Sequence, residues 1–415
     1  MPFSFSGLSA SLVRAVAHYA APTPVQAAAI PAVLTGGDVL ATAPTGSGKT
    51  TAFVLPLLQR WLSAPHETPR RVHTLILVPT RELAAQVRGV VQEISLHLPE
   101  RLKVVSAVGG VSINPQMMAL RGGADFIVAT PGRLLDLVDQ NALQLSGVSV
   151  LVLDEADRML DLGFADELAR ILKLLPTNRQ NLLFSATFPQ AVESMAQNFL
   201  NKPTRIEIAA DLISGPAIQQ RAIRVDTEQR APLLRHLIAT QGWKRVLVFV
   251  ASQYTADHVA DKLRRNGITA RSFHGNVSQG GRSGVLADFK NSEFQVLVAT
   301  DLAGRGLDIS QLPVVINYDL PRSAVDYSHR IGRTGRAGEA GEAISFVTAA
   351  SHANFCLIEK RQHLEVPREE ISGFEPTEAV PSASPGGGGI KGQRKSKKDK
   401  LREAAAREKR MRGGK

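Results

Sequence analysis

The sequence predicts an α/β fold of two tandem units, each a mainly parallel sheet with helices on both faces, followed by a disordered basic tail. Three observations support this prediction. Short, continuous apolar runs alternate with helix-like segments over residues 39–347, a pattern that is typical of parallel strands buried on both faces. A stretch without helical pattern, residues 211–220, divides the series into halves of similar size. After about residue 375, Pro, Ser and Gly replace the apolar residues, as in disordered segments.

The elements can be assigned in chain order. Residues 3–38 are expected to form helices and turns, with helices at 9–16 and 26–34 separated by Pro22 and Pro24. The first half has strand-like runs at 39–43, 74–78, 103–107, 125–129, 149–153 and 181–185. The second half has them at 221–225, 245–250, 269–273, 295–299, 313–317 and 343–347. Whether the halves share a fold stays open here, because no strong sequence repeat relates them.

Composition limits the class of protein. A length of 415 residues favours two or three domains, and the 44% hydrophobic and 21% charged fractions are those of a globular protein. The single cysteine, Cys356, excludes an intrachain disulfide and suits a reducing compartment. We expect Cys356 to be a small buried apolar residue rather than a catalytic thiol.

Membrane and secretion signals are not expected. No apolar run approaches the roughly 20 residues that span a bilayer. Residues 1–6 have neither a basic segment nor a long apolar segment of the kind found in a secretory signal. We therefore expect a cytoplasmic protein with no membrane partner.

A glycine-rich turn, A-P-T-G-S-G-K-T at residues 43–50, follows the first apolar run. Gly46 and Gly48 would let several backbone N–H groups point at one anion, and the helix that follows adds the positive end of its dipole. Lys49 would reach the β and γ phosphates of a nucleotide, and Thr50 would hold Mg²⁺ through its hydroxyl. The Walker A pattern begins with Gly where this chain has Ala43. The alternative interpretation is a plain glycine-rich turn.

Two carboxylates follow the fifth apolar run. Ligands of open α/β sheets bind at the carboxyl ends of strands, so Asp154 would reach Mg²⁺ and Glu155 would orient and deprotonate a water. The alternative is an acidic helix start that stabilises the helix dipole. The phosphate loop in the same half favours the catalytic interpretation.

Residues 154–157 spell D-E-A-D, and the sequence resembles the DEAD-box ATP-dependent RNA helicases of superfamily 2. The resemblance covers about residues 3–365 and is most similar to the bacterial RhlE-like subgroup. Its further motifs, in family order, are T-P-V-Q at 23–26, P-T-R-E-L at 79–83, G-G at 109–110, T-P-G-R at 130–133, S-A-T at 185–187, V-F-V at 248–250, H-G at 274–275, Gln279 with Arg282, A-T-D at 299–301, R-G-L-D at 305–308 and H-R-I-G-R-T-G-R at 329–336.

The resemblance implies two RecA-like domains. The first, with its Q motif, would span residues 1–208 and the second 221–372, with a linker at 209–220 and the tail at 373–415. Gln26 would select adenine through its amide, and an upstream aromatic ring would stack on the base; Phe3 fits the family register, but Phe5 is close to it. The nucleotide-binding residues implied are Phe3, Thr23, Gln26, Thr45, Gly46, Ser47, Gly48, Lys49, Thr50 and Asp308.

The same resemblance implies the remaining site residues. Arg333 and Arg336 would be arginine fingers supplied by the second domain, although such a run is also typical of a solvated basic loop. Ser185 and Thr187 would couple Asp157 to RNA-dependent closure. Arg and Thr side chains and free backbone N–H groups suit phosphate and 2′-OH contacts that do not read sequence, though each residue can equally be structural. The RNA-binding residues implied are Arg81, Gly110, Thr130, Arg133, Gly275, Thr300 and Arg305.

The tail is the electrostatic outlier. Residues 390–415 carry 12 Lys and Arg against 3 Asp and Glu, so +9 of the chain's net +11 lies there. Such a segment suits a polyanion, and we expect a tether for RNA; a merely solvated charge run or a protein contact is the alternative.

Together with the resemblance, these features predict an RNA-stimulated ATPase. By analogy with the family, it would separate short duplexes locally, without long translocation, or remodel RNA–protein complexes. An ATP-switched RNA-binding or annealing protein is one alternative, and a superfamily 2 DNA helicase is a weaker one. Ribosomal or RNA-degradation complexes are the partners that the resemblance implies. The sequence identifies neither the target RNA nor the oligomeric state.

Overall fold

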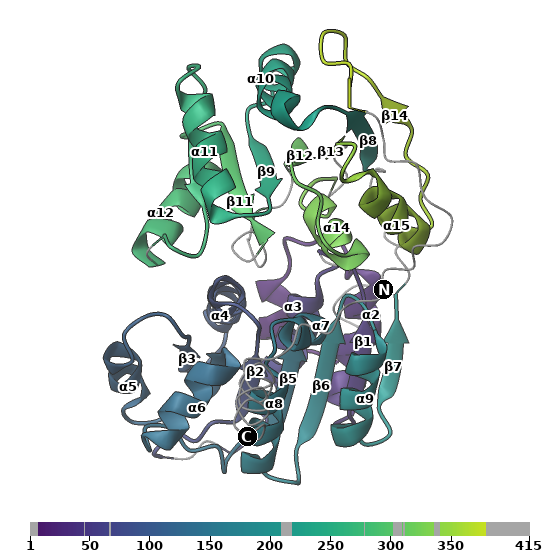
Figure 1. Ribbon diagram of the computed structural model, residues 1–415. Coiled ribbons are helices and arrows are strands. Elements are labelled where there is room, and N and C mark those ends of the chain that lie inside the picture. The colour runs from purple at the N-terminus through teal and green to yellow at the C-terminus, as the bar shows by residue number, and fades with distance from the viewer. Residues whose placement is uncertain are drawn as a thin grey trace, which may run out of the picture. The chain divides into compact units, whose positions relative to one another are not determined.

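The described residues form two seven-stranded sheets, one in each half of the chain (Figure 1). In the computed structural model these residues are 7–44, 46–65, 68–208, 218–277, 279–301, 309, 312–335 and 341–378. Strand pairs in both sheets are parallel, for example β1 with β6 and β9 with β11. The structure thus confirms the predicted fold class of tandem, mainly parallel α/β domains.

The first half contains seven strands and the helices that connect them. The strands are β1 (Val39–Thr42), β2 (Thr74–Leu77), β3 (Val104–Ala107), β4 (Phe126–Ala129), β5 (Val150–Asp154), β6 (Gln180–Ser185) and β7 (Thr204–Glu207). The helices are α1 (Ala10–Ala15), α2 (Pro24–Leu34), α3 (Lys49–Leu62), α4 (Arg81–Ser95), α5 (Asn114–Leu120), α6 (Pro131–Asp139), α7 (Ala156–Asp161), α8 (Ala165–Leu174) and α9 (Gln190–Phe199).

The second half repeats this plan. Its strands are β8 (Gln219–Arg224), β9 (Val246–Val250), β10 (Ala270–Phe273), β11 (Val296–Thr300), β12 (Val314–Asn317), β13 (Glu342–Val347) and β14 (Arg368–Glu369). Its helices are the 3₁₀ turn η3 (Thr227–Gln229), α10 (Arg230–Gln241), α11 (Gln253–Arg264), α12 (Gln279–Lys290), α14 (Ala324–Ile331) and α15 (His352–Gln362).

The two sheets share one topology. Their strand orders are β3-β4-β2-β5-β6-β1-β7 and β10-β11-β9-β12-β13-β8-β14. Counted within each half, both orders read 3-4-2-5-6-1-7. This common order answers the question that the sequence left open, because it relates the halves as copies of one fold without an evident sequence repeat.

Alternate residues of the central strands enter opposite cores. In β2, Ile76 packs with α2, α3 and α4, whereas Leu75 and Leu77 pack with α6 to α9 on the other face. In β9, Val248 packs with α10 and α11, whereas Phe249 packs with Phe289 of α12. Burial on both faces requires apolar residues at every position of such a strand, which explains why these strands read as continuous apolar runs.

Several boundaries differ from those expected. The edge strands β7 and β14 were not predicted, and β8 begins at Gln219, inside the stretch assigned to the linker. Helix α2 begins at Pro24 rather than at residue 26, because proline fits the first turn of a helix, where its missing N–H has no partner to lose.

The second half also extends beyond residue 372, the end expected for that domain. Phe374 packs against its core, and the Asp226 carboxylate accepts hydrogen bonds from the backbone N–H groups of Thr377 (2.8 Å) and Glu378 (3.0 Å). The ordered contacts of this half therefore continue to Glu378.

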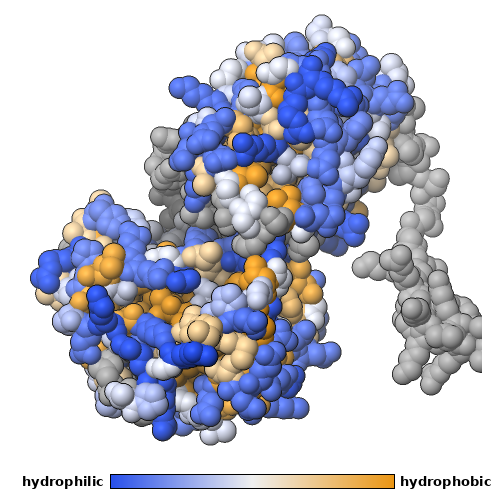
Figure 2. All heavy atoms as spheres, turned by 90° about the vertical axis from the view of Figure 1, so that its left-hand side faces the viewer, coloured by the Kyte–Doolittle hydropathy of each residue, from blue (hydrophilic) through white to orange (hydrophobic). Residues whose placement is uncertain are grey.

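The surface carries more polar than apolar area on the face that bears α5 and α6 (Figure 2). Apolar areas are interspersed there, and Met118 of α5 is 54% exposed. Cys356 is exposed on α15, so the prediction that it is buried was wrong. Among the described residues, no helix is both long and apolar enough to cross a membrane.

Candidate active site

The glycine-rich turn lies between β1 and α3 and is shaped by two left-handed glycines. Gly46 has φ 81° and Gly48 has φ 92°, a conformation that costs glycine little and other residues more. Gly48 is the N-cap of α3, so the free N–H groups of the first helical turn follow directly. Lys49 is buried, and its Nζ donates to the Ala43 carbonyl at 2.6 Å. The turn therefore brings a cation and helix-start donors together, as a phosphate site requires.

Gln26 joins the start of α2 to this turn. Its Oε1 accepts from the Thr23 backbone N–H (3.0 Å), and its Nε2 donates to the Gly48 carbonyl (3.3 Å). The Thr23 hydroxyl in turn accepts from the Gln26 backbone N–H (3.4 Å), so the two residues form a reciprocal N-terminal cap. Gln26 thus supports the phosphate loop as well as carrying the amide proposed to read adenine.

Asp154 ends β5 and is nearly inaccessible to solvent, with 3% exposed. Burial, with Glu155 beside it, raises the pKa of the Asp154 carboxyl to about 7, while Lys49 opposes the rise. A buried carboxylate favours its neutral form unless a cation compensates it. The carboxyl group is therefore placed where binding of a cation would stabilise its charge.

Glu155 has an unusual backbone. Its φ and ψ are 53° and 51°, the left-handed region, at the N-cap of α7. Its N–H donates to Asp154 Oδ1 at 3.0 Å. Left-handed residues other than glycine are strained and cluster at functional sites. The chain thus turns sharply at the end of β5. Asp154 is the last residue of the strand, whereas Glu155 has a left-handed backbone.

Asp157 connects this turn to the end of β6. Its Oδ2 accepts from the Thr187 hydroxyl at 2.6 Å and from the Thr187 N–H at 3.0 Å. The Asp157 backbone N–H donates to the Ser185 hydroxyl at 3.4 Å. The three residues predicted to act in coupling therefore form one hydrogen-bonded junction.

The RNA-binding candidates of the first half gather around the turn that follows β3. Arg81 donates to the Gly110 carbonyl (3.2 Å), the Thr130 hydroxyl accepts from the Gly109 N–H (3.2 Å), and Arg133 donates to the Val111 carbonyl (2.9 Å). Arg81 at the start of α4, with Thr130 and Arg133 at the start of α6, thus holds one glycine turn in shape.

Gln116 supports the same turn and was not predicted. Its side chain accepts from the Val108 N–H (2.9 Å) and donates to the Val108 carbonyl (3.1 Å). A glutamine inside a helix carries no sequence signal for this role.

In the second half, the candidates that the structure describes lie at strand ends. Gly275 is exposed after β10, and Thr300 is the buried last residue of β11. A Cβ added at Gly275 would lie 3.4 Å from Gln253 Nε2, so the side chain of the first residue of α11 packs close to it. The two candidates share the carboxyl edge of their sheet but make no hydrogen bond to each other.

Arg330 organises the arginine-rich motif. It forms a bidentate ion pair with Asp301 (2.6 and 2.7 Å) and donates to Asn317 Oδ1 (3.0 Å) and to the Asp319 carbonyl (2.6 Å). Its side chain is 2% exposed. Sequence reasoning selected Arg333 and Arg336 as site residues but missed Arg330. The partners of Arg330 lie at the ends of β11 and β12, and only the fold brings them to it.

Arg333 follows two residues after α14 and is 8% exposed. Its N–H donates to the Arg330 carbonyl (3.2 Å), so the buried Arg330 fixes the backbone that carries it. Next to Arg330, burial lowers the pKa of the His329 imidazole. Predicted site residues outside the described part of the chain are Phe3, Thr45, Arg305, Asp308 and Arg336, together with residues 379–415 of the tail.

The residues assigned to Mg²⁺ have suitable chemistry. Asp154 and Thr50 supply a carboxylate and a hydroxyl, the hard oxygen ligands that Mg²⁺ prefers. The buried, poorly compensated charge of Asp154 fits a cation neighbour. Within the described ranges, no group of three or more His, Cys, Asp or Glu could hold a metal. One carboxylate and one hydroxyl leave other ligand positions of a Mg²⁺ ion to groups such as nucleotide phosphates.

Comparisons with known proteins agree with this geometry. Residues 23–195 match the family described as DEAD/DEAH box helicase, and residues 229–338 match the helicase conserved C-terminal domain. The chain is 39% identical to the DEAD-box ATP-dependent RNA helicase CshA of Streptococcus pneumoniae, over 91% of this chain and 70% of that protein.

Solved structures of related proteins share the fold. Saccharomyces cerevisiae Dbp5 bound to RNA and ADP BeF3 is 31% identical, with a TM-score of 0.80 over 89% of this chain and 95% of the other. Mss116p bound to ssRNA and AMP-PNP is 27% identical, with a TM-score of 0.81 over 91% and 80%. The phosphate loop, the Asp154–Asp157 turn and these matches together show that the chain belongs to the DEAD-box family of ATP-dependent RNA helicases.

Proposed function

We propose that the chain couples ATP binding and hydrolysis to RNA binding and to local, non-processive separation of short duplexes or remodelling of RNA–protein complexes. The junction between Asp157, Ser185 and Thr187 carries this proposal most directly. It joins the turn with the proposed catalytic carboxylates to a second loop at the same sheet edge. A change at the nucleotide can therefore be passed on through hydrogen bonds.

The proposed chemistry assigns a role to each group. The phosphate loop and Lys49 would bind the β and γ phosphates, with Mg²⁺ held by Thr50 and Asp154 and supplying charge neutralisation. Glu155 would orient a water and accept its proton, since it directly follows the buried Asp154. Gln26 would recognise adenine by its amide. Arg333 and Arg336 would stabilise the charge of the transferring phosphoryl group.

RNA would be recognised through its backbone. Arg81, Thr130 and Arg133 converge on the glycine turn at 109–111, and such groups contact phosphate and sugar rather than base edges. Binding of both ATP and RNA would favour a closed state of the two domains, so that hydrolysis depends on RNA. Hydrolysis and phosphate release would then reopen the enzyme and free the RNA.

The test compares nucleic acids and activities. ATPase rate is measured with single-stranded RNA, with single-stranded DNA and with neither, and duplex separation is measured with and without ATP. We expect stimulation by RNA and ATP-dependent separation that Arg333→Ala abolishes. Stimulation by DNA alone would support a DNA helicase, and strand annealing that persists in Arg333→Ala without any separation would support an annealing protein.

The finer assignments belong to the same proposal. We propose a cytoplasmic location, and we infer membership of the RhlE-like subgroup and ribosomal or RNA-degradation partners from the resemblance. The basic segment 390–415 would act as an RNA tether that raises the local RNA concentration. Deleting it is expected to weaken RNA affinity and its salt dependence while leaving basal ATPase unchanged.

A further inference from the structure

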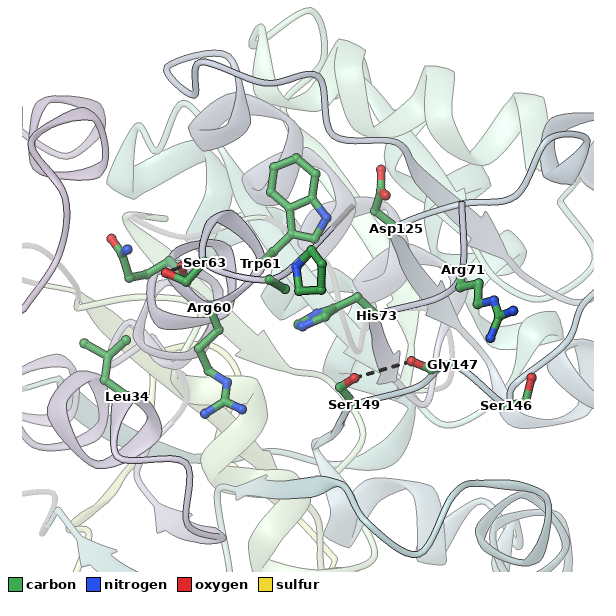
Figure 3. Close-up of a pocket in the computed structure, with 13 residues that line it drawn as sticks. Leu34, Arg60, Trp61, Ser63, Arg71, His73, Asp125, Ser146, Gly147 and Ser149 are labelled. Carbon is green, nitrogen blue, oxygen red and sulfur yellow. Dashed lines mark hydrogen bonds between the residues drawn. The ribbon is translucent and has the colours of Figure 1, made fainter. Parts of the chain in front are cut away.

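A cavity of about 730 Å³ lies at the amino edge of the first sheet (Figure 3). Two polar side chains of its lining already bind within the protein. The Ser149 hydroxyl donates to the Gly147 carbonyl (3.4 Å), and the Asp125 carboxylate accepts from Arg70 Nε (3.0 Å). The RNA-binding candidates follow the carboxyl ends of strands instead, so a further contact with RNA is expected at a carboxyl edge.

An exposed aromatic ring stands at the carboxyl edge of the second sheet. Tyr254 is the second residue of α11, directly after the loop that follows β9, and it is 76% exposed. The other tyrosines of this half, Tyr318 and Tyr327, are at most 7% exposed. Single apolar side chains are common on protein surfaces, so the exposure of Tyr254 alone assigns it no role, and its position decides.

Three neighbouring strands end level with one another at this edge. β11 lies between β10 and β9. Thr300, the last residue of β11, is paired with Val250 at the end of β9. Ala299 is paired with Phe273 at the end of β10. The strands therefore end side by side, with the proposed RNA contacts Thr300 and Gly275 at or just after their ends.

Tyr254 is next to one of these contacts. The preceding residue, Gln253, packs beside the exposed Gly275, and its Nε2 would lie 3.4 Å from a Cβ added there. Consecutive Cα atoms are about 3.8 Å apart, so Tyr254 is one short step from the side chain that borders Gly275. An RNA strand that contacts Gly275 through its backbone would therefore pass the start of α11.

Hydrogen bonds hold the segment that carries the ring. The Ser252 hydroxyl accepts from the Thr255 N–H (3.0 Å) and caps α11. The Ala251 N–H donates to the Asp319 carboxylate (2.8 Å), and the Asp319 carbonyl accepts from Arg330 (2.6 Å). A group that is already positioned loses less conformational entropy on binding, so this segment suits a binding surface.

The Tyr254 ring is oriented along α11. It stacks on the His258 ring, one turn further, with centroids 5.8 Å apart and planes 11° from parallel. Lys262, one more turn along the same face, is exposed and adds a cation. The Asp257 carboxylate accepts from the Ser272 hydroxyl of β10 (2.5 Å). An accessible aromatic face with a cation on the same side is the combination that binds single-stranded nucleic acid.

We infer that Tyr254 stacks on a base of the bound RNA strand. The inference rests on the proposed RNA binding and adds a contact with a base face to the proposed backbone contacts at Gly275 and Thr300. Every base has an aromatic face, so stacking is compatible with binding that does not read sequence. The stack would hold one nucleotide against the second domain.

The test measures the affinity of the full chain for a fluorescein-labelled oligouridine by anisotropy, in the presence of a non-hydrolysable ATP analogue. We expect Tyr254→Ala to weaken binding at least about fivefold, the effect of losing one base–aromatic stack. Tyr254→Phe and Tyr254→Trp keep a ring and should bind within about twofold of wild type. The salt dependence of binding should not change, because no charge is removed.

An oligomer of abasic ribose phosphate separates stacking from backbone contact. Wild type and Tyr254→Ala should bind it equally, because the base is absent and the phosphates remain; equal binding also shows that the variant is folded. Leu357→Ala, which changes a 56% exposed side chain on α15, is the control and should bind oligouridine as wild type does.

Three results would overturn the inference while wild type still binds RNA. They are oligouridine affinity of Tyr254→Ala within about twofold of wild type, wild-type affinity of Tyr254→Leu, which has an apolar side chain but no ring, and a Tyr254→Ala defect that persists on the abasic oligomer. A wild-type chain that binds no RNA would instead contradict the proposed function, and the inference with it.

Discussion

The Asp157 carboxylate accepts two hydrogen bonds from Thr187, one from its hydroxyl at 2.6 Å and one from its backbone N–H at 3.0 Å. The short bond to an ionised acceptor is the stronger kind of hydrogen bond. It ties the turn after β5 to the loop after β6. If hydrolysis is coupled to RNA rearrangement through this junction, weakening it should separate the two activities.

Thr187→Val tests that coupling. The valine keeps the shape and the backbone N–H bond but removes the hydroxyl bond, worth about 1.5–3 kcal/mol when the acceptor is charged. We expect RNA-stimulated ATPase to stay within about threefold of wild type while duplex separation falls at least tenfold. Thr177→Val, at an exposed turn after α8, is the control. Parallel loss of both activities would contradict a coupling role.

Gly48→Ala tests the phosphate loop. A Cβ at Gly48 would lie 2.5 Å from Gln26 Nε2, and the residue has φ 92°, so both the contact and the backbone oppose a side chain. We expect ATP affinity to fall at least about tenfold, measured by binding of a fluorescent ATP analogue. Gly89→Ala is the control, because that glycine lies inside α4 with no atom near its added Cβ; it should bind ATP normally and be slightly more stable.

The raised pKa of Asp154 predicts that the stability of the first domain depends on pH. Its pKa of about 7 lies above the unbound carboxyl value of 3.8, so the fold favours the protonated form. Stability of the nucleotide-free first domain should therefore fall as pH rises from about 4 to about 7, by a few kcal/mol at most. Asp154→Asn removes this loss.

The measurement is thermal unfolding of wild type and Asp154→Asn in EDTA without nucleotide. At pH 8 the variant should melt several degrees higher, and near pH 4 the difference should vanish. Asp139→Asn, an exposed carboxylate on α6, should show no such window. A variant that melts lower than wild type at pH 8 would show that the buried charge is already compensated.

Arg330→Lys tests the arginine-rich motif of the second half. Lysine cannot form the bidentate pair with Asp301 and also reach Asn317, so buried groups lose partners. We expect destabilisation of about 3–5 kcal/mol, the usual cost of breaking a buried pair, seen in denaturant unfolding of the second domain. Arg361→Lys, exposed on α15, should change stability by less than about 0.5 kcal/mol; an equally small effect for Arg330→Lys would contradict the role of this residue.

Much of the fold was readable because its signal is local. The central strands are buried on both faces, so runs such as residues 246–250 are apolar at every position. The edge strand β7 has only Ile206 buried, and β14 has two residues. Neither carries a run long enough to be recognised, and tertiary pairing alone makes them strands.

The site divides in the same way. The phosphate loop and the Asp154–Asp157 turn are contiguous in sequence, so the residues that form each turn could be identified from residue type and spacing. The chemical roles assigned to these residues are predictions. The roles of Arg330 and Gln116 depend on partners at the ends of other strands and turns, which only the fold brings together. Short contiguous motifs therefore do not predict supporting residues such as Arg330 and Gln116.

The ATPase rate of Glu155→Gln with and without RNA tests the central claim most directly. The amide keeps the shape of the side chain but cannot accept a proton from water. The account predicts that RNA-stimulated hydrolysis falls at least about 100-fold while ATP and RNA still bind, since Lys49 and the glycine turn at 109–111 are untouched. Hydrolysis at the wild-type rate would contradict the assignment of Glu155 as the base, and with it the proposed mechanism.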